Sequence, residues 1–211
     1  MANERALNYE QIKKAYAFFS PFYDLLFDKI FYPGRVAAIA LLEIKPQDRI
    51  LEVGIGTGLN LSLYPRDCHL VGIDLSAEML KKAQEKVEQY RMHNVSLLEM
   101  DASAMEFADD EFDHVLATYV ISAVPDPVKV FLEIKRVCKP GGRIVFLNHF
   151  QSENPFLGTL EEAIAPICLR LGFKTDLKLR PLLEEVELTP EREFRVNLLN
   201  GWRLIRCLNQ K

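Results

Sequence analysis

The stretch ILEVGIGTGLNL, residues 50–61, joins an apolar segment to three alternating glycines, with an acidic residue just before the first glycine. Glycine permits positive φ and a close approach of backbone to ligand, so such a loop after a strand is typical of a nucleotide site. The third glycine comes one position too early for the dinucleotide fingerprint GxGxxG, and no P-loop lysine follows. Glu52, two residues before Gly54, would repel a pyrophosphate and attract an ammonium group. The stretch therefore favours a nucleoside that carries a positive charge and no phosphate.

Apolar segments recur along the chain on both sides of this loop. Strand patterns cover residues 49–53, 69–75, 95–100, 113–120 and 143–148. Several are nearly continuous apolar runs, which is typical of a parallel sheet covered on both faces. Helix patterns separate them, most clearly at residues 76–92, with Ser76 as N-cap, and at residues 125–142, where Pro140 and two glycines end the helix. The alternation predicts a doubly wound α/β fold, in which ligands bind at the carboxyl ends of the strands.

The regions on either side of this central part also have recognisable patterns. Residues 8–44 and 158–173 have helical patterns, and residues 201–208 alternate like an edge strand. We expect residues 1–45 to form a helical lid that binds substrate, and residues 46–211 to form the nucleotide-binding domain.

Residues 15–32, AYAFFSPFYDLLFDKIFY, are the richest aromatic stretch of the chain. One interpretation is a helical lid whose aromatic residues are all buried. The other is a helix that packs partly on the sheet and lies partly in a lipid interface. Lys13, Lys14, Lys29 and Arg35 would then offer positive charge to an anionic membrane surface.

Composition limits the class of protein. The 211 residues suit one domain with a small appendage, and a net charge of −4 gives no reason to expect nucleic acid as a ligand. The four cysteines are scattered without the spacing of a zinc site, so no metal is expected. The N-terminus lacks the apolar core of a signal peptide, and no apolar run is long enough to span a membrane. We therefore expect a cytoplasmic protein, free or peripheral on the inner face of the cell membrane, without a stable protein partner.

Acidic residues follow the next two predicted strands. Asp74 ends the second strand, twenty residues after Gly54, where an acid can accept hydrogen bonds from both hydroxyls of a ribose. Asp101, followed by Ala102, comes after the third strand and can accept from an adenine amino group. Met79, one turn into the following helix, can pack on the base. Each of these residues also has a structural interpretation. Asp74 could cap a helix, Asp101 could be an ordinary loop acid, and Met79 could be a core residue.

These residues lie in four segments, LEVGIGTG, VGIDLSAEML, MDASAMEFADDEFDHVLATYVISAVPDP and RVCKPGGRIVFLNH, which follow in order over residues 48–149. Over this span the chain resembles class I S-adenosylmethionine-dependent methyltransferases. The resemblance implies a Rossmann-like, mostly parallel sheet of seven strands with the last strand antiparallel and helices on both faces. It also implies S-adenosylmethionine as cofactor, with the glycine loop and its acid around the methionine end, Asp74 on the ribose and Asp101–Ala102 at the adenine. The candidate cofactor-binding residues are Glu52, Gly54, Gly56, Thr57, Gly58, Asn60, Asp74, Leu75, Met79, Asp101 and Ala102.

Three further segments narrow the resemblance. YDLLFDKIFYPGR at residues 23–35, YVISAVPDP at 119–127 and LNHF at 147–150 are similar to soluble bacterial phosphatidylethanolamine N-methyltransferases. That similarity implies N-methylation of the ethanolamine head group, in one or more rounds toward phosphatidylcholine, on phospholipid at a membrane surface. Quinone-biosynthesis C-methyltransferases share the YD start and the PGG turn, so a quinone precursor is an alternative acceptor. A non-catalytic cofactor-binding protein is a third hypothesis.

Methyl transfer to an amine requires positioning and a neutral nitrogen lone pair. His149, after the fifth predicted strand, is a candidate proton acceptor or a ligand for the lipid phosphate, and Asn148 beside it could orient the substrate. Tyr16, Tyr23 and Tyr119 are the other catalytic candidates, because tyrosine rings attract methylated ammonium groups. The alternative is that His149 only bonds a neighbouring loop and that the tyrosines pack in the core.

Overall fold

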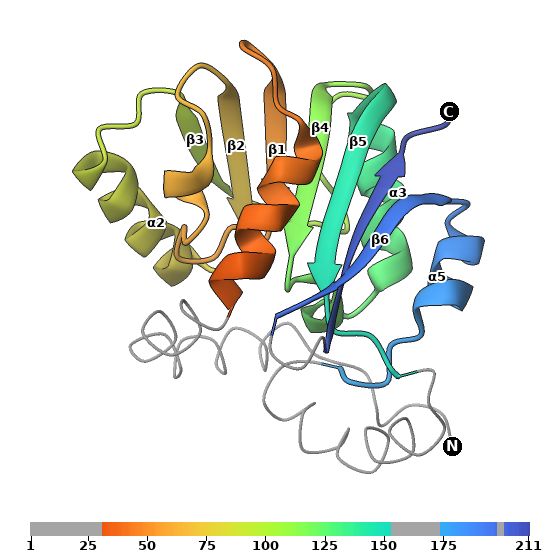
Figure 1. The fold of residues 1–211 in the computed structure, drawn as a ribbon. Helices are drawn as coiled ribbons and strands as arrows, with labels where there is room; N and C mark the ends of the chain where they lie inside the picture. Colours follow the sequence, from red (N-terminus) through yellow and green to blue (C-terminus); the bar gives the residue numbers. More distant parts are fainter. Residues whose placement is uncertain (1–30, 153–173, 198–200) are drawn as a thin grey trace.

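A sheet of seven strands in the order β3-β2-β1-β4-β5-β7-β6 lies at the centre of the molecule (Figure 1). The computed structural model describes residues 31–152, 174–197 and 201–211. The strands are β1 (Arg49–Val53), β2 (His69–Asp74), β3 (Val95–Glu99), β4 (Phe112–Thr118), β5 (Cys138–Asn148), β6 (Pro190–Val196) and β7 (Trp202–Leu208). Strands β1 to β5 are parallel, whereas β7 runs antiparallel to both β5 and β6. The predicted mostly parallel sheet with an antiparallel last strand is therefore confirmed.

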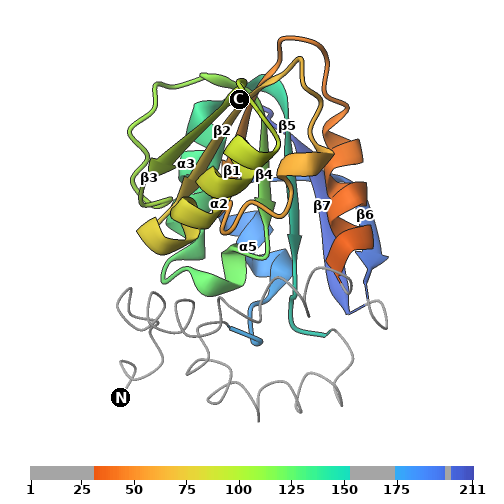
Figure 2. The ribbon, with the colours of Figure 1, turned by 90° about the vertical axis from the view of Figure 1, so that its left-hand side faces the viewer.

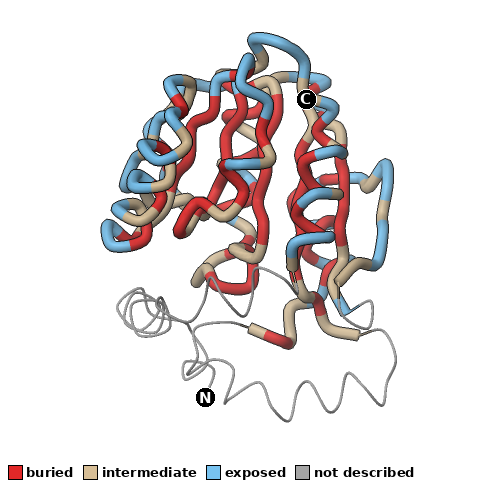
Figure 3. The backbone as a smooth tube through the Cα atoms, turned by 60° about the vertical axis from the view of Figure 1, so that its left-hand side comes forward, coloured by how far each residue is buried: buried red, intermediate tan, exposed pale blue. Residues whose placement is uncertain are grey.

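Helices cover both faces of this sheet (Figure 2). The helical elements are residues 31–42, η1 (Leu61–Leu63), α2 (Ala77–Gln89), η2 (Ile121–Ala123), α3 (Pro127–Val137) and α5 (Leu179–Glu185). Residues 31–42 and α2 pack on one face, and α3 and α5 pack on the other. The central strands β1, β2 and β4 are largely buried, as expected for strands of a sheet with two covered faces (Figure 3).

Local sequence signals set where the two longest labelled helices begin. Ser76 caps α2 by accepting a hydrogen bond from the backbone N–H of Met79 at 3.4 Å. Asp126 caps α3 in the same way, accepting from Lys129 N at 3.1 Å, with Pro127 as the first helical residue. Both caps lie at the carboxyl ends of strands, so the loops that precede these helices face the ligand edge of the sheet.

Helical residues 31–42 belong to the layer that covers the sheet. Ala38 and Leu42 are fully buried against strand residues of the core. Just beyond them, Glu43 forms ion pairs with Arg206 of β7 and Arg143 of β5, each at 2.6 Å. Residues 1–30, the remainder of the expected helical lid, lie outside the described residues, as does the helix expected at residues 158–173.

The structure corrects the prediction of an edge strand at residues 201–208. Strand β7 lies inside the sheet between β5 and β6, and β6 forms the edge. Sequence analysis missed β6 because PEREFRV is mostly charged and no residue of this strand is fully buried. It also missed α5, whose single buried face of Leu179, Leu182 and Leu183 is too short for a clear helical period.

The structure also corrects the predicted end of helix α3. Helix α3 ends at Val137, and Cys138 already pairs with Phe112 in the sheet, whereas the sequence suggested a helix that Pro140 and the glycines at 141 and 142 bring to an end. The Pro-Gly-Gly sequence is instead an early part of β5. Gly141 N donates to Asn209 O at 2.8 Å, and Asn209 N donates to Gly142 O at 2.9 Å. Gly141 has a φ of +75°, and the register between β4 and β5 shifts at this point, so the strand is irregular here. The two bonds attach this irregular part of β5 to the chain after β7.

Candidate functional site

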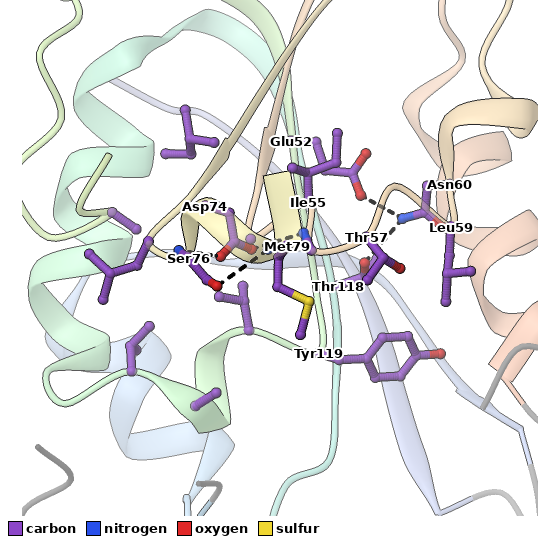
Figure 4. Close-up of a pocket in the computed structure, with 18 of the residues that line it drawn as sticks. Glu52, Ile55, Thr57, Leu59, Asn60, Asp74, Ser76, Met79, Thr118 and Tyr119 are labelled. Carbon is purple, nitrogen blue, oxygen red and sulfur yellow. Dashed lines mark hydrogen bonds between the residues drawn. The ribbon is translucent and has the colours of Figure 1, made fainter. Parts of the chain in front are cut away.

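A pocket lies at the carboxyl ends of β1, β2 and β4, where a doubly wound sheet binds its ligands (Figure 4). Of the eleven candidate cofactor residues, ten line it: Glu52, Gly54, Gly56, Thr57, Asn60, Asp74, Leu75, Met79, Asp101 and Ala102. Gly58 does not. A Cβ at Gly58 would lie 2.5 Å from Cδ1 of Leu61 and 3.1 Å from Cβ of Ala83, so this glycine serves the packing of the loop against α2.

The glycine loop is held against β2. Gly54 N and Ile55 N both donate to Ile73 O, at 2.8 and 3.0 Å. Gly54 has a φ of +69°, and a Cβ there would lie 2.6 Å from the side chain of Val120. Gly56 has a φ of +56° with open space where a Cβ would be. The backbone of the loop therefore faces the pocket without side chains in between.

Glu52 is a buried acid at the floor of this pocket, with 1% of its surface exposed. Its Oε1 accepts from Asn60 Nδ2 at 2.6 Å, and its Oε2 accepts from the Tyr64 hydroxyl at 2.9 Å. Asn60 Nδ2 also lies 3.2 Å from Thr118 Oγ1, which ties the acid to the end of β4. Burial raises the pKa of Glu52 to about 7, although both hydrogen bonds lower it. A carboxylate with so little solvation favours a cationic partner in the pocket.

Arg35, from the helical residues 31–42, lines the same pocket and is only 3% exposed. Its positive charge acts on Glu52 by lowering the pKa of that carboxyl. The sequence interpretation of Arg35 as a surface charge for a membrane is therefore wrong. A buried guanidinium and a buried carboxylate in one pocket are the pair of charges that an amino-acid zwitterion requires.

Asp74 presents a carboxylate whose orientation is set by the backbone. Its Oδ2 accepts from Gly56 N at 2.8 Å, and its Oδ1 accepts from Ser76 N at 2.9 Å. Burial raises its pKa, and these backbone bonds act in the opposite direction. Each oxygen keeps a further lone pair with which to accept a hydroxyl donor from a ligand. Met79, which is 4% exposed, lines the pocket beside this acid (Figure 4).

Asp101 and Ala102 line the pocket after β3. Asp101 Oδ1 accepts from both the backbone N–H and the hydroxyl of Ser103, each at 2.8 Å. The loop-acid interpretation and the ligand interpretation are therefore compatible, because the same contacts that shape the loop fix the carboxylate in place.

Tyr119 and Phe31 form an aromatic wall of the pocket, with ring centroids 4.8 Å apart. Figure 4 shows the Tyr119 ring extending away from Met79, with its hydroxyl turned away from Asp74. The hydroxyl accepts from Asn197 Nδ2 at 3.0 Å and lies 3.4 Å from Phe31 O. Tyr119 thus offers the pocket its ring, while its hydroxyl is engaged elsewhere.

The remaining candidates lie apart from the lining. Asn148 is fully buried and donates to His149 O at 3.1 Å. His149 Nδ1 lies 3.0 Å from Gly201 O, and its ring meets Trp202 at a centroid distance of 6.0 Å. Tyr16 and Tyr23 lie outside the described residues.

Sequence reasoning missed four contributors to the site: Arg35, Tyr64, Thr118 and Asn197. Tyr64 and Thr118 act by contacts with a recognised residue, and no spacing rule identifies such partners. Within residues 31–152, 174–197 and 201–211, no His, Cys, Asp and Glu cluster has the arrangement of a metal site. In these same ranges, no helix combines the length and apolar character needed to cross a membrane.

Proteins that are similar to this chain in sequence are methyltransferases. The family model described as "Methyltransferase domain" matches residues 51–146. The phosphatidylethanolamine N-methyltransferase of Cereibacter sphaeroides is 40% identical over 174 residues, which cover 80% of this chain and 85% of that protein. The demethylmenaquinone methyltransferase of Listeria welshimeri is 30% identical over 69% of this chain and 65% of its own length.

A solved S-adenosylmethionine-dependent methyltransferase from Aquifex aeolicus has the same fold, with a TM-score of 0.65. The two chains are 19% identical, and the match covers 93% of this chain and 97% of that one. The buried acid, the glycine loop and the acid after β2 fit the groups of S-adenosylmethionine, which has an amino-acid end and a ribose and carries no phosphate. The chain therefore belongs to the class I S-adenosylmethionine-dependent methyltransferases and is an enzyme that uses this cofactor.

Proposed function

We propose that this enzyme transfers methyl groups from S-adenosylmethionine to the nitrogen of phosphatidylethanolamine, in one or more rounds toward phosphatidylcholine. The observation that carries the proposal is the 40% identity, over 80% of the chain, to a phosphatidylethanolamine N-methyltransferase. The aromatic wall of Tyr119 and Phe31 supports it, because aromatic faces attract ammonium and methylated ammonium groups.

For the cofactor, we assign the ends of the pocket by charge. Glu52 binds the ammonium of the methionine end, and Arg35 its carboxylate. Asp74 binds the ribose hydroxyls through the lone pairs that Gly56 and Ser76 leave. Asp101 and Ala102 bind the adenine edge, and Met79 packs on the base. The cofactor, when bound, supplies a methyl group on a sulfonium. The chain's own task is to align an acceptor with that methyl and to exclude water.

An ethanolamine nitrogen is mostly protonated at neutral pH and must lose a proton before it can attack. His149 is the candidate acceptor of that proton. The Nδ1 contact with the carbonyl of Gly201 favours the tautomer in which Nδ1 is protonated, which places the lone pair of the neutral ring on Nε2. Asn148 would orient the substrate beside it.

Residues 1–45 complete the proposal as a helical segment that covers the acceptor side and meets the lipid. Tyr16 and Tyr23 would add aromatic faces for the methylated head group. The enzyme would then work as a cytoplasmic protein that visits the inner face of the cell membrane, where its phospholipid substrate lies, without a stable protein partner.

The test is an acceptor assay with S-adenosylmethionine that is radiolabelled in the methyl group. Purified enzyme is incubated with vesicles containing phosphatidylethanolamine or with demethylmenaquinone, and the products are separated. We expect label in mono-, di- or trimethylated phospholipid, and none with Glu52→Gln. Label in the quinone alone would replace the proposal by the alternative that the Listeria relative suggests. Cofactor binding without label in either acceptor would show that the methyl acceptor is a different molecule.

A further inference from the structure

Asn197 follows the edge strand β6 and joins two elements that line the pocket. Its side-chain Oδ1 accepts from Gly34 N at 3.0 Å, and its Nδ2 donates to the Tyr119 hydroxyl at 3.0 Å. A backbone N–H can only donate, so the oxygen of the amide must face Gly34 and the nitrogen must face the tyrosine. One side chain thus links helical residues 31–42 to the loop after β4.

Both residues joined by the Asn197–Tyr119 hydrogen bond have an unusual backbone conformation. Asn197 has a φ of +63° and Tyr119 a φ of +60°, both in the left-handed region that most side chains avoid. Asparagine tolerates this region better than other residues with a side chain. Tyr119 is further fixed by its backbone N–H, which donates to Leu147 O at 2.7 Å. Residues held in such sparsely populated backbone conformations are concentrated at active sites and ligand-binding sites, so the position of the Tyr119 ring is expected to matter for function.

Gly34 is the matching half of the contact. A Cβ at this residue would lie 2.4 Å from Asn197 Oδ1 and 2.9 Å from Nδ2, so only glycine leaves room for the amide. One turn of the helix connects Gly34 to both Phe31 and Arg35, which line the pocket. The contact of the Asn197 amide with Gly34 therefore helps to position the Phe31 and Arg35 side chains in the pocket wall.

We propose that Asn197 is a positioning residue for methyl transfer, which holds the ring of Tyr119 and the helix that carries Phe31 against the acceptor side of the pocket. The inference rests on the proposed function for the nature of the acceptor. Asn197 itself does not line the pocket, so it acts through Tyr119 and not by contact with a ligand.

The first test does not need an acceptor. Trp202 is the single tryptophan of the chain, and its ring lies 4.9 Å from that of Phe31. Release of Phe31 should move the Trp202 emission to longer wavelength and increase its quenching by acrylamide. We expect this change in Asn197→Ala and in Gly34→Ala. Asn94→Ala is the matched control, because Asn94 Nδ2 donates to Cys68 O at 2.8 Å at the opposite end of the sheet.

The second test separates positioning from stability. Asn197→Ala should lower kcat for the phospholipid about tenfold or more while the Kd for S-adenosylmethionine stays within about threefold. Because Asn197 acts through the tyrosine hydroxyl, the double variant with Tyr119→Phe should lose no more than the worse single variant. Asn197→Asp should restore most activity, since its carboxylate accepts from Gly34 and can also accept the Tyr119 hydroxyl proton, which would turn to it from Phe31 O.

The outcomes are distinct. Unchanged Trp202 emission in both Asn197→Ala and Gly34→Ala overturns the inference, and so do losses that multiply in the double variant. If the wild type does not methylate phosphatidylethanolamine, the proposed function fails, while the Trp202 measurement still decides the role of Asn197. Should Asn197→Ala not fold, Gly34→Ala and Asn197→Asp carry both tests.

Discussion

Tyr64 donates its hydroxyl proton to Oε2 of Glu52 across 2.9 Å, in a part of the pocket that solvent hardly reaches. This bond stabilises the ionised acid, yet burial outweighs it and raises the pKa of Glu52 from 4.5 to about 7. The state of this acid therefore changes near neutral pH.

We predict that cofactor affinity depends on pH through Glu52. Below about pH 7 the acid is protonated, so binding an ammonium must release a proton, and affinity should fall about tenfold for each pH unit. Above roughly pH 8 the cofactor's own amino group loses its proton and affinity should fall again. Calorimetry in buffers of different ionisation enthalpy measures both limbs. Glu52→Gln should bind weakly with no acid limb, and an unchanged limb would show that another group titrates.

The same shift predicts the stability of the enzyme without cofactor. A carboxyl with a raised pKa in the folded state favours folding while it is protonated, so stability should fall as pH rises from 4.5 to about 7. The loss is on the order of 3 kcal/mol. Urea unfolding across this range measures it, and Glu52→Gln should flatten this part of the profile if the assignment is right.

Removal of the carboxylate of Asp74 should weaken cofactor binding strongly. Two hydrogen bonds from ribose hydroxyls to a charged acceptor would be lost in Asp74→Ala, which predicts a rise of roughly 10- to 1000-fold in Kd. Equilibrium binding measures it. Asp113→Ala is a matched control, because Asp113 accepts from Arg49 N at 2.8 Å at the other end of the strands. Equal affinity in the wild type and Asp74→Ala would remove this acid from the ribose.

Arg35 should distinguish S-adenosylmethionine from its decarboxylated form. The wild type should prefer the carboxylated ligand by roughly 10- to 100-fold, the value of charge-assisted hydrogen bonds to a guanidinium. Arg35→Met should remove that preference, whatever it does to each Kd through Glu52. Arg49→Met is a control, since Arg49 begins β1 and is paired with Glu111 far from the pocket. A preference that survives in Arg35→Met would assign the carboxylate to another residue.

His149→Ala should lower kcat about 100-fold or more while cofactor affinity stays nearly constant, as expected for loss of a proton acceptor. Single-turnover kinetics and binding isotherms measure the two effects separately. His114→Ala offers a comparison, because His114 pairs with Asp48 at 3.3 Å at the opposite end of the parallel strands. Turnover that survives in His149→Ala would make this histidine a packing partner of Trp202.

Features that depend on neighbouring residues in the chain were predictable from the sequence. The glycine loop, Glu52 and Asp74 lie on the neighbouring parallel strands β1 and β2 and at the start of the connection between them, so their short spacing predicts that they line one pocket. Strands β1, β2 and β4 were recognisable for a different reason, because burial on both faces leaves long apolar runs.

Features that depend on contacts between distant residues were not predictable. Arg35 reads as a surface cation until the helix that carries it is packed on the sheet, where it becomes buried. Asn197 and Tyr119 are 78 residues apart, and no local pattern links them. Edge strand β6 has neither a core face nor a clear period, so its place in the sheet comes from pairing with β7.

The order of the sheet has a consequence for synthesis of the protein. Strand β7 leaves the ribosome after β5 and β6, yet it lies between them in the sheet. Until residues 202–208 are available, β5 presents an unpaired edge and β6 has no partner in the sheet. The cofactor half, β1 to β4, can form earlier. A nascent or truncated chain that ends before β7 should therefore be the form most exposed to aggregation and to chaperones.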